Sequence, residues 1–244
     1  MRLAQLTDCH LLADPAARGR IGVPLRQLEA VVAAVNRQRP DRVVVTGDIS
    51  QDETATSYRL AERVLSRLDA PWCWLPGNHD RTDRMADCRP LPEALDLGDW
   101  RALLLDTHVS GREGGELGAE RRSALDASLD GDPRPTLLMM HHPPLPVGAA
   151  WLDAIGLADA EAFWRVVAPH GQIRGVFFGH VHQAFRGVQA LADREIPLYG
   201  CPATSDQFLP DSPTFALDEA SRPGYRLIDL GEGEFETWVE RLDP

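Results

Sequence analysis

Short apolar runs alternate with amphipathic segments over the first third of the chain. The apolar runs predict strands at residues 2–7, 42–46 and 72–75, and the middle one consists mostly of β-branched valine. Between them, apolar residues recur at helical spacing in 24–39 and again after Thr54, a residue that can cap a helix. Strands and helices therefore alternate, which is typical of a parallel sheet with helical crossovers.

The pattern becomes less regular beyond residue 81. Apolar runs still predict strands with helices between them, whereas 81–98 is polar and has room for one short helix. The segment 108–118 carries four glycines and is expected to be a mobile loop. The strands are expected at 100–106, 136–140 and 173–178, and the helices at 119–129 and about 159–170.

The last quarter of the chain changes to short strands. They are expected near 185–189, 196–199, 225–230 and 235–239, and Gly231-Glu232-Gly233 joins the last two as a hairpin. These strands suggest a second, more antiparallel sheet. Since we find no internal repeat or clear linker, we expect a single domain over residues 1–244. The tail from about residue 201 is expected to form part of the second sheet and of the pocket rim.

Composition narrows the class of protein further. The chain has 244 residues and is 43% hydrophobic, which allows one large domain with a substantial core. No apolar run approaches the roughly 20 residues that cross a membrane. The N-terminus enters a strand without a signal-peptide pattern, so a cytoplasmic location is the default expectation.

Charge excludes several functions. The net charge of −12 disfavours binding to a nucleic-acid polymer or a membrane surface, both of which need a basic face. All 25 basic residues are arginine, so neither Schiff-base chemistry nor a P-loop is available. The four cysteines lack CxxC spacing, which argues against a zinc knuckle or a redox pair. Any positive site would have to draw its charge from metal ions.

Polar side chains that can bind metals follow five of the predicted strands. Strand ends at one edge of a sheet converge, so residues that are remote in sequence can form one cluster. We also expect residues two apart to share a face of an extended segment, which pairs Asp8 with His10 and His180 with His182. The groups in chain order are Asp8 with His10, Asp48, Asn78 with His79, His141 with His142, and His180 with His182.

This mixture of carboxylate, imidazole and amide oxygen suits first-row ions such as Mn, Fe, Co, Ni or Zn. It contains too much nitrogen for calcium or magnesium. The seven candidate ligands exceed one tetrahedral site and fit two ions about 3.5–4 Å apart that share a carboxylate. They are Asp8, His10, Asp48, Asn78, His141, His180 and His182.

The ordered motifs resemble those of the calcineurin-like metallophosphoesterases. The matching residues span about 3–182 and include Asp8-x-His10, Gly47-Asp48, Gly77-Asn78-His79-Asp80, His141-x-Pro143 and Gly179-His180-x-His182. The resemblance implies an α/β fold with four layers, an α-β-β-α sandwich of two mixed sheets packed face to face with helices outside. It also implies a hydrolytic centre with two metal ions.

Finer features resemble the bacterial class III cyclic nucleotide phosphodiesterases. These features are His141-His142-Pro143-Pro144-Leu145-Pro146, Trp151-Leu152-Asp153 and the tail from Pro202 through Phe215 to Asp218. They imply hydrolysis of a small phosphodiester such as cAMP. A related glycerophosphodiesterase branch shares the first feature, so a glycerophosphodiester or broad phosphodiester hydrolase is the alternative. A non-catalytic scaffold with this fold is a third reading, although every ligand position is filled.

The resemblance also implies a role for each residue. Asp8, His10, Asp48 and His182 would hold one ion, and Asp48, Asn78, His141 and His180 the other, with Asp48 as the bridge. The ions would be divalent or of mixed valence, with Mn, Fe, Co and Zn as candidates.

A hydroxide between the ions would attack phosphorus, and Asp48 and Asn78 would serve catalysis as ligands. His79 would stay outside the ligand set and protonate the leaving oxygen or stabilise its charge. Asp80 would either orient His79 or close the turn. The sequence is compatible with a homodimer and leaves the roles of Cys9 and His108 open.

Overall fold

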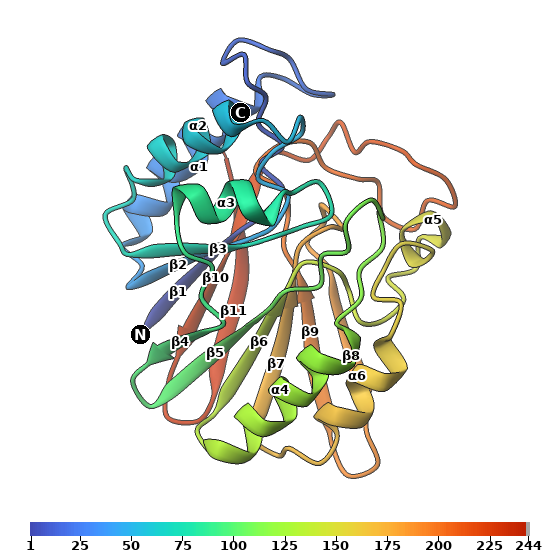
Figure 1. The fold of residues 1–244 in the computed structure, drawn as a ribbon. Helices are drawn as coiled ribbons and strands as arrows, with labels where there is room; N and C mark the ends of the chain where they lie inside the picture. The colour runs from blue at the N-terminus through green and yellow to red at the C-terminus, as the bar shows by residue number, and fades with distance from the viewer. Residues whose placement is uncertain (243–244) are drawn as a thin grey trace.

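Three hydrophobic clusters separate the layers of the molecule. Figure 1 shows this computed structural model, which describes residues 1–242, as two β-sheets with helices on their outer faces. One cluster lies between the two sheets, and the other two lie beneath the helices. Leu3, Val44 and Phe177 belong to the cluster between the sheets. The predicted four-layer α-β-β-α fold is therefore confirmed.

The first sheet has five strands in the order β11-β10-β1-β2-β3. Its strands β1, β2 and β3 are parallel, as the alternation of strands and helices predicts. Helices α1 and α2 make the crossovers, and the hydroxyl of Thr54 caps α2 by accepting from the backbone N–H of Ser57. The bounds are β1 Arg2–Leu6, α1 Pro24–Gln38, β2 Arg42–Thr46, α2 Ala55–Leu65, β3 Trp72–Leu75, β10 Gly224–Leu230 and β11 Phe235–Arg241.

The second sheet has six strands in the order β4-β5-β6-β7-β9-β8. Its four central strands are parallel, and the two edge strands are antiparallel to their neighbours. Residues 81–98 hold the expected short helix, α3, and in addition the edge strand β4, whereas Trp151 lies in the short helix α5. The bounds are α3 Thr82–Cys88, β4 Ala94–Leu97, β5 Trp100–Leu105, α4 Gly118–Gly131, β6 Thr136–Met140, α5 Ala150–Asp153, α6 Ala160–Val167, β7 Ile173–Phe178, β8 Arg186–Ala190 and β9 Glu195–Gly200.

The prediction for the tail needs a correction. Strands β8 and β9 do join the second sheet, but β10 and β11 return to the first sheet, where β10 pairs antiparallel with β1. Strand β10 carries apolar residues on both faces, so that Leu227 packs beneath the helices and Ile228 between the sheets. A strand buried on both faces fits the interior of a sheet, and here it covers what would be the open edge of β1.

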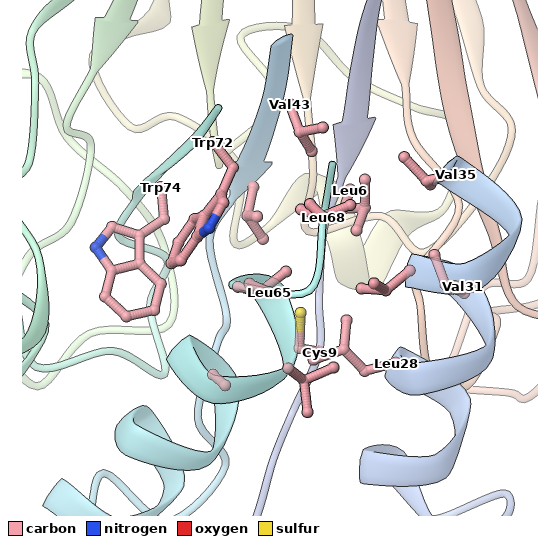
Figure 2. Packing of buried hydrophobic residues seen from close by; sticks show 14 of the residues in the cluster. Leu6, Cys9, Leu28, Val31, Val35, Val43, Leu65, Leu68, Trp72 and Trp74 are labelled. Carbon is pink, nitrogen blue, oxygen red and sulfur yellow. The ribbon is translucent and has the colours of Figure 1, made fainter. Parts of the chain in front are cut away.

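Cys9 lies between Asp8 and His10 in the sequence and belongs to the cluster beneath α1 and α2. Cys9 is fully buried there, and its sulfur lies beside Leu28 (Figure 2). Burial raises the pKa of this thiol to about 12, so it is a packing residue rather than a reactive one. Among residues 1–242, no helix combines the length and the apolar character needed to cross a bilayer.

Leu28→Ala is expected to destabilise the fold by about 2–5 kcal/mol, because Leu28 is fully buried and the vacated space lies in a packed cluster. Urea unfolding followed by circular dichroism measures this change. The matched control is Leu209→Ala, at a leucine that is 43% exposed, and it should change stability by less than about 0.5 kcal/mol. Equal effects of the two substitutions would contradict this description of the core.

Candidate metal centre

The ends of β1, β2, β3, β6 and β7 bring all seven predicted ligands into two adjoining clusters. In the first cluster, the Nε2 atoms of His10 and His182 lie 3.2 Å apart. Asp8 Oδ1 is 3.3 Å from His182 Nε2 and 4.0 Å from His10 Nε2. Asp48 Oδ2 lies 3.6 Å from His10 Nε2, so two carboxylates and two imidazoles surround one point.

The second cluster begins at the other oxygen of the same aspartate. Asp48 Oδ1 is 3.4 Å from His141 Nε2, which lies 3.1 Å from Asn78 Oδ1. The same amide oxygen is 3.0 Å from His180 Nδ1. The two oxygens of Asp48 thus face different clusters, as expected of a carboxylate shared by two ions.

These spacings suit metal ligands. Donor atoms about 2.1 Å from one first-row ion lie roughly 3.0–3.5 Å from one another. In addition, the buried Oδ1 atom of Asp8 has no hydrogen-bond partner. Buried carboxylate oxygens are rarely left without one, and a cation explains the exception. The residues present therefore fit a centre of two metal ions.

Two of the imidazoles are oriented by backbone carbonyl groups. The Nδ1–H of His141 donates to the carbonyl of Thr46 at 2.8 Å, and the Nδ1–H of His182 donates to the carbonyl of Asp206 at 2.7 Å. Each bond fixes the proton on Nδ1 and leaves the lone pair of Nε2 facing its cluster. Such second bonds are typical of histidines that bind metals.

The backbone explains how the side chains converge. Five of the seven residues have a positive φ, between 48° and 66°, which is uncommon outside glycine. Asp8 and His10, as well as His180 and His182, are therefore not in the extended conformation that the sequence argument assumed. Left-handed turns aim them instead, and such conformations gather at functional sites. The residues are Asp8, His10, Asp48, His180 and His182.

Two glycines make room for these contacts. A Cβ on Gly77 would collide with Asp48 Oδ1, and one on Gly47 would collide with His141 Nδ1. Gly47 also has a φ of +95°. The glycines of the Gly-Asp and Gly-Asn-His motifs are therefore required by close approach to the ligands.

Asp80 closes the loop that carries Asn78 and His79. Its carboxylate accepts from the backbone N–H groups of Gly77, Ile49 and Ser50 and from the hydroxyl of Tyr58. Of the two roles left open for Asp80, these contacts support the closing of the turn.

His79 is half-buried, and its ring lies edge-on to that of His10. The side chain of Gln51 lies 3.4 Å from His79 Nδ1. The backbone N–H of His79 donates to Asp48 Oδ1 at 2.9 Å, which positions the residue without making its imidazole a ligand.

His142 lies near the second cluster, but both of its ring nitrogens are engaged. Nε2–H donates to the carbonyl of Glu113 at 3.2 Å, and Nδ1 accepts from the hydroxyl of Thr107 at 2.7 Å. Burial holds the pKa of His142 well below its usual value, so the ring is neutral. These contacts agree with a supporting role for His142 and leave His141 to face the cluster.

A pocket of about 360 Å³ opens over the two clusters. Glu113 from the glycine-rich loop lines it together with Trp151, and so do Phe208 and Phe215 from the tail, as the sequence predicts for the tail. Arg20 also lines it and was missed. The sequence offered one indication that Arg20 lies near the site, because the loop that carries it directly follows His10. His108 is not among the residues that line this pocket.

The buried acids and imidazoles depend on one another for their charge. Burial opposes the charged form of Asp48, but the neighbouring His141 outweighs it and holds the pKa of Asp48 well below its usual value. Burial likewise opposes the charged form of His141, yet Asp48 raises the pKa of His141 to about 9. Burial lowers the pKa of His10 to about 4.

The fold and the two clusters define a metallophosphoesterase with a site for two metal ions. Consistent with this class, the family model described as calcineurin-like phosphoesterase matches residues 1–184. The chain belongs to this family.

Its relatives match over the full length. The chain is 36% identical to the 3',5'-cyclic adenosine monophosphate phosphodiesterase CpdA of Pseudomonas aeruginosa, over 99% of this chain and 90% of the relative. It is 38% identical to CpdA of Vibrio vulnificus over the same shares. A 3',5'-cyclic-nucleotide phosphodiesterase of Nostoc is 34% identical, over 98% of this chain and 92% of the relative.

Solved structures share the fold at low sequence identity. A dimetal phosphatase from Danio rerio superposes with a TM-score of 0.67 and 16% identity, and the match covers 98% of both chains. A purple acid phosphatase from yellow lupin has the same TM-score at 13% identity, over 98% of this chain and 51% of the phosphatase. These matches support the fold alone.

Metal binding at the second cluster is expected to release a proton. Below about pH 9 the Nε2 of metal-free His141 carries a proton, which an ion must displace. At pH 7 we expect release of about one proton, and an affinity that rises with pH up to about 9. Calorimetric titration of metal-free protein with Mn²⁺, in buffers of different ionisation enthalpy, measures this release.

The His141→Asn variant is the control for this experiment, since it lacks the proton in question. It should show a smaller dependence on the buffer than the unaltered protein. Binding heats that are the same in every buffer for the unaltered protein would refute the assignment.

Proposed function

We propose that this chain hydrolyses 3',5'-cyclic nucleotides, cAMP among them, at a centre of two metal ions. The observation that carries the proposal is the double set of donor atoms around Asp48, in a chain that matches named cyclic nucleotide phosphodiesterases over its whole length. A small phosphodiester is the partner, and the half-open pocket over the clusters is its binding site.

The proposed ligands divide between the two clusters. Asp8, His10, Asp48 and His182 would hold one ion, and Asp48, Asn78, His141 and His180 the other. When bound, two such ions supply an activated water near neutral pH and neutralise the charge that develops on phosphate oxygens. Manganese, iron, cobalt and zinc all suit this donor set.

Asn78 has a second role in this proposal. Its side chain is half-buried, and its Oδ1 atom is turned toward His141 and His180. This orientation leaves the amide N–H₂ group as a donor at the pocket wall. A phosphate oxygen of the substrate can accept from it and so be oriented within the pocket.

His79 is the proposed proton donor. It lines the pocket, and its backbone is fixed by Asp48 rather than by a bond to its ring. The side-chain amide of Gln51 lies beside Nδ1, which leaves Nε2 available to the substrate. In the imidazolium form of His79, the proton on Nε2 can pass to the ribose 3'-oxygen as the ester bond breaks, and the ring is left as a neutral imidazole.

Two further expectations remain predictions. The four cysteines are free thiols, which fits the reducing cytoplasm that we propose as the location. The second expectation is that the chain forms a homodimer, and sedimentation of the purified protein measures its mass in solution.

The substrate proposal is tested with a panel on protein reconstituted with Mn²⁺. We expect hydrolysis of cAMP with a kcat/KM at least about tenfold above that for glycerophosphoethanolamine, and loss of both activities in EDTA. Restoration by Mn²⁺ or Co²⁺ controls for damage by the chelator. A preference for the glycerophosphodiester would favour the alternative hydrolase, and inactivity on every diester would favour the scaffold.

A second test distinguishes the proposed roles of Asn78 and His79 by their effects on metal content and turnover. Asn78→Ala removes a proposed ligand and should lower both the metal content and turnover. His79→Ala removes a proton donor and should lower kcat by about 10²–10⁴-fold with the metal content retained. Elemental analysis beside steady-state kinetics measures both effects, and a His79→Ala protein that has lost one ion would disprove the outer role of His79.

A further inference from the structure

Three aromatic side chains form one wall of the pocket beside the metal centre. Trp151, Phe208 and Phe215 contact one another edge to face, with ring centroids 5.1–5.4 Å apart. Phe208 also stacks on His182 at 3.9 Å, so the wall is continuous with the first cluster. Phe215 is 49% exposed, which is unusual for so large an apolar side chain and leaves part of its ring accessible to a ligand.

Arg20 stands at this wall. Its guanidinium carbon lies over the ring of Phe215, 5.3 Å from the centroid, and Nη1 is 3.4 Å from Asp206 Oδ2. The side chain of Arg20 is 40% exposed whereas that of Asp206 is 5% exposed, so a buried carboxylate holds an arginine that still faces the pocket. Asp206 is itself fixed, because its carbonyl accepts from His182.

The chemistry of this arrangement matches a nucleobase. Every nucleobase can stack on an aromatic side chain, so the wall provides affinity for a base without discriminating between bases. A guanidinium presents donors only, and it pairs best with two adjacent acceptors, such as O6 and N7 of guanine. The corresponding edge of adenine offers N7 beside the N6 amino group, which is a donor.

Two carboxylates line this pocket among the described residues, and Asp48 is one of the proposed metal ligands, which leaves Glu113. Glu113 only accepts, and it can pair with the N1–H and N2–H₂ groups of guanine or with the amino group of adenine. It has no donor for O6 and N7 of guanine, so contact with this edge of the base falls to Arg20.

On the basis of the proposed function, we propose that the base of a cyclic nucleotide stacks on Trp151 and Phe215, and that Arg20 contacts its edge. Arg20 is then a specificity-determining residue that lets the enzyme use cyclic GMP alongside cyclic AMP. Asp206 is a positioning residue that holds the guanidinium in place.

The experiment compares kcat/KM for cGMP and cAMP in the metal-loaded enzyme and its variants. Arg20→Met keeps an unbranched apolar stem but removes every donor. We expect it to lower the ratio of cGMP to cAMP by about fivefold or more, the lower end of what one bidentate contact provides. The change should lie in KM, since Arg20 is not among the proposed ligands or the proton donor. Asp206→Asn, which keeps the carbonyl that holds His182, should shift the ratio in the same direction.

Arg18→Met is the matched control. Arg18 is an exposed arginine on the same loop and is not among the residues that line this pocket, so its loss should leave the ratio unchanged. Metal content and melting temperature of each variant show that the centre and the fold are intact.

Each other outcome overturns the inference. An unchanged ratio in Arg20→Met, with both nucleotides equally impaired, would mean that Arg20 serves the phosphate rather than the base. The same shift in Arg18→Met would mean a general effect of charge. If the unaltered enzyme cleaves the cyclic nucleotides but the ratio does not respond to Arg20, only this inference fails. If it cleaves neither, the proposed function fails with it.

Discussion

The structure depends on a set of buried charges that satisfy one another only in part. Asp8, Asp48 and four imidazoles are at most 5% exposed, and their donor atoms face the same two points. Burying charge is costly unless an opposite charge is close, and turning several lone pairs toward one point adds repulsion. Protons relieve part of this conflict, which is why the pKa of His141 is raised. Two cations relieve it more completely. The left-handed turns that aim these side chains cost free energy, and such conformations are found chiefly at functional sites.

The centre also straddles two sheets, so their packing sets its geometry. Asp8, Asp48 and Asn78 follow strands of the first sheet, whereas His141 and His180 follow strands of the second. Hydrogen bonds cross the gap: His141 donates to the carbonyl of Thr46, and the N–H of His180 donates to Asp8. The cluster between the sheets is apolar and closely packed, and such interiors deform little. A slip of one sheet over the other would separate the two halves of each ligand set.

Much of this arrangement could be predicted from the sequence, because the metal-compatible residues of the site lie in short local motifs. The strand at 42–46, the order of the motifs and the seven candidate ligands follow from apolar runs that end in metal-compatible side chains. The pairing of β10 with β1 could not be predicted, because a strand with two apolar faces suits the interior of either sheet. The positive φ of Asp8 and His10 was missed as well, since most aspartates and histidines still have a negative φ. Arg20 was missed because its partner, Asp206, is far away in the sequence.

The segment after β9 links the aromatic wall of the pocket to the metal centre. The hydroxyl of Ser205 donates to the carbonyl of Asp8, the carbonyl of Asp206 orients His182, and Phe208 stacks on the same histidine. These residues lie beyond the match to the general family model, which ends at residue 184. The part of the chain that the family model covers therefore carries the metal-compatible motifs, whereas this segment orients His182 and contributes Phe208 and Phe215 to the wall of the pocket. Side chains of this segment that face the pocket can accordingly differ without disturbing the two clusters, provided that the contacts of Ser205 to Asp8 and of the Asp206 carbonyl to His182 are kept.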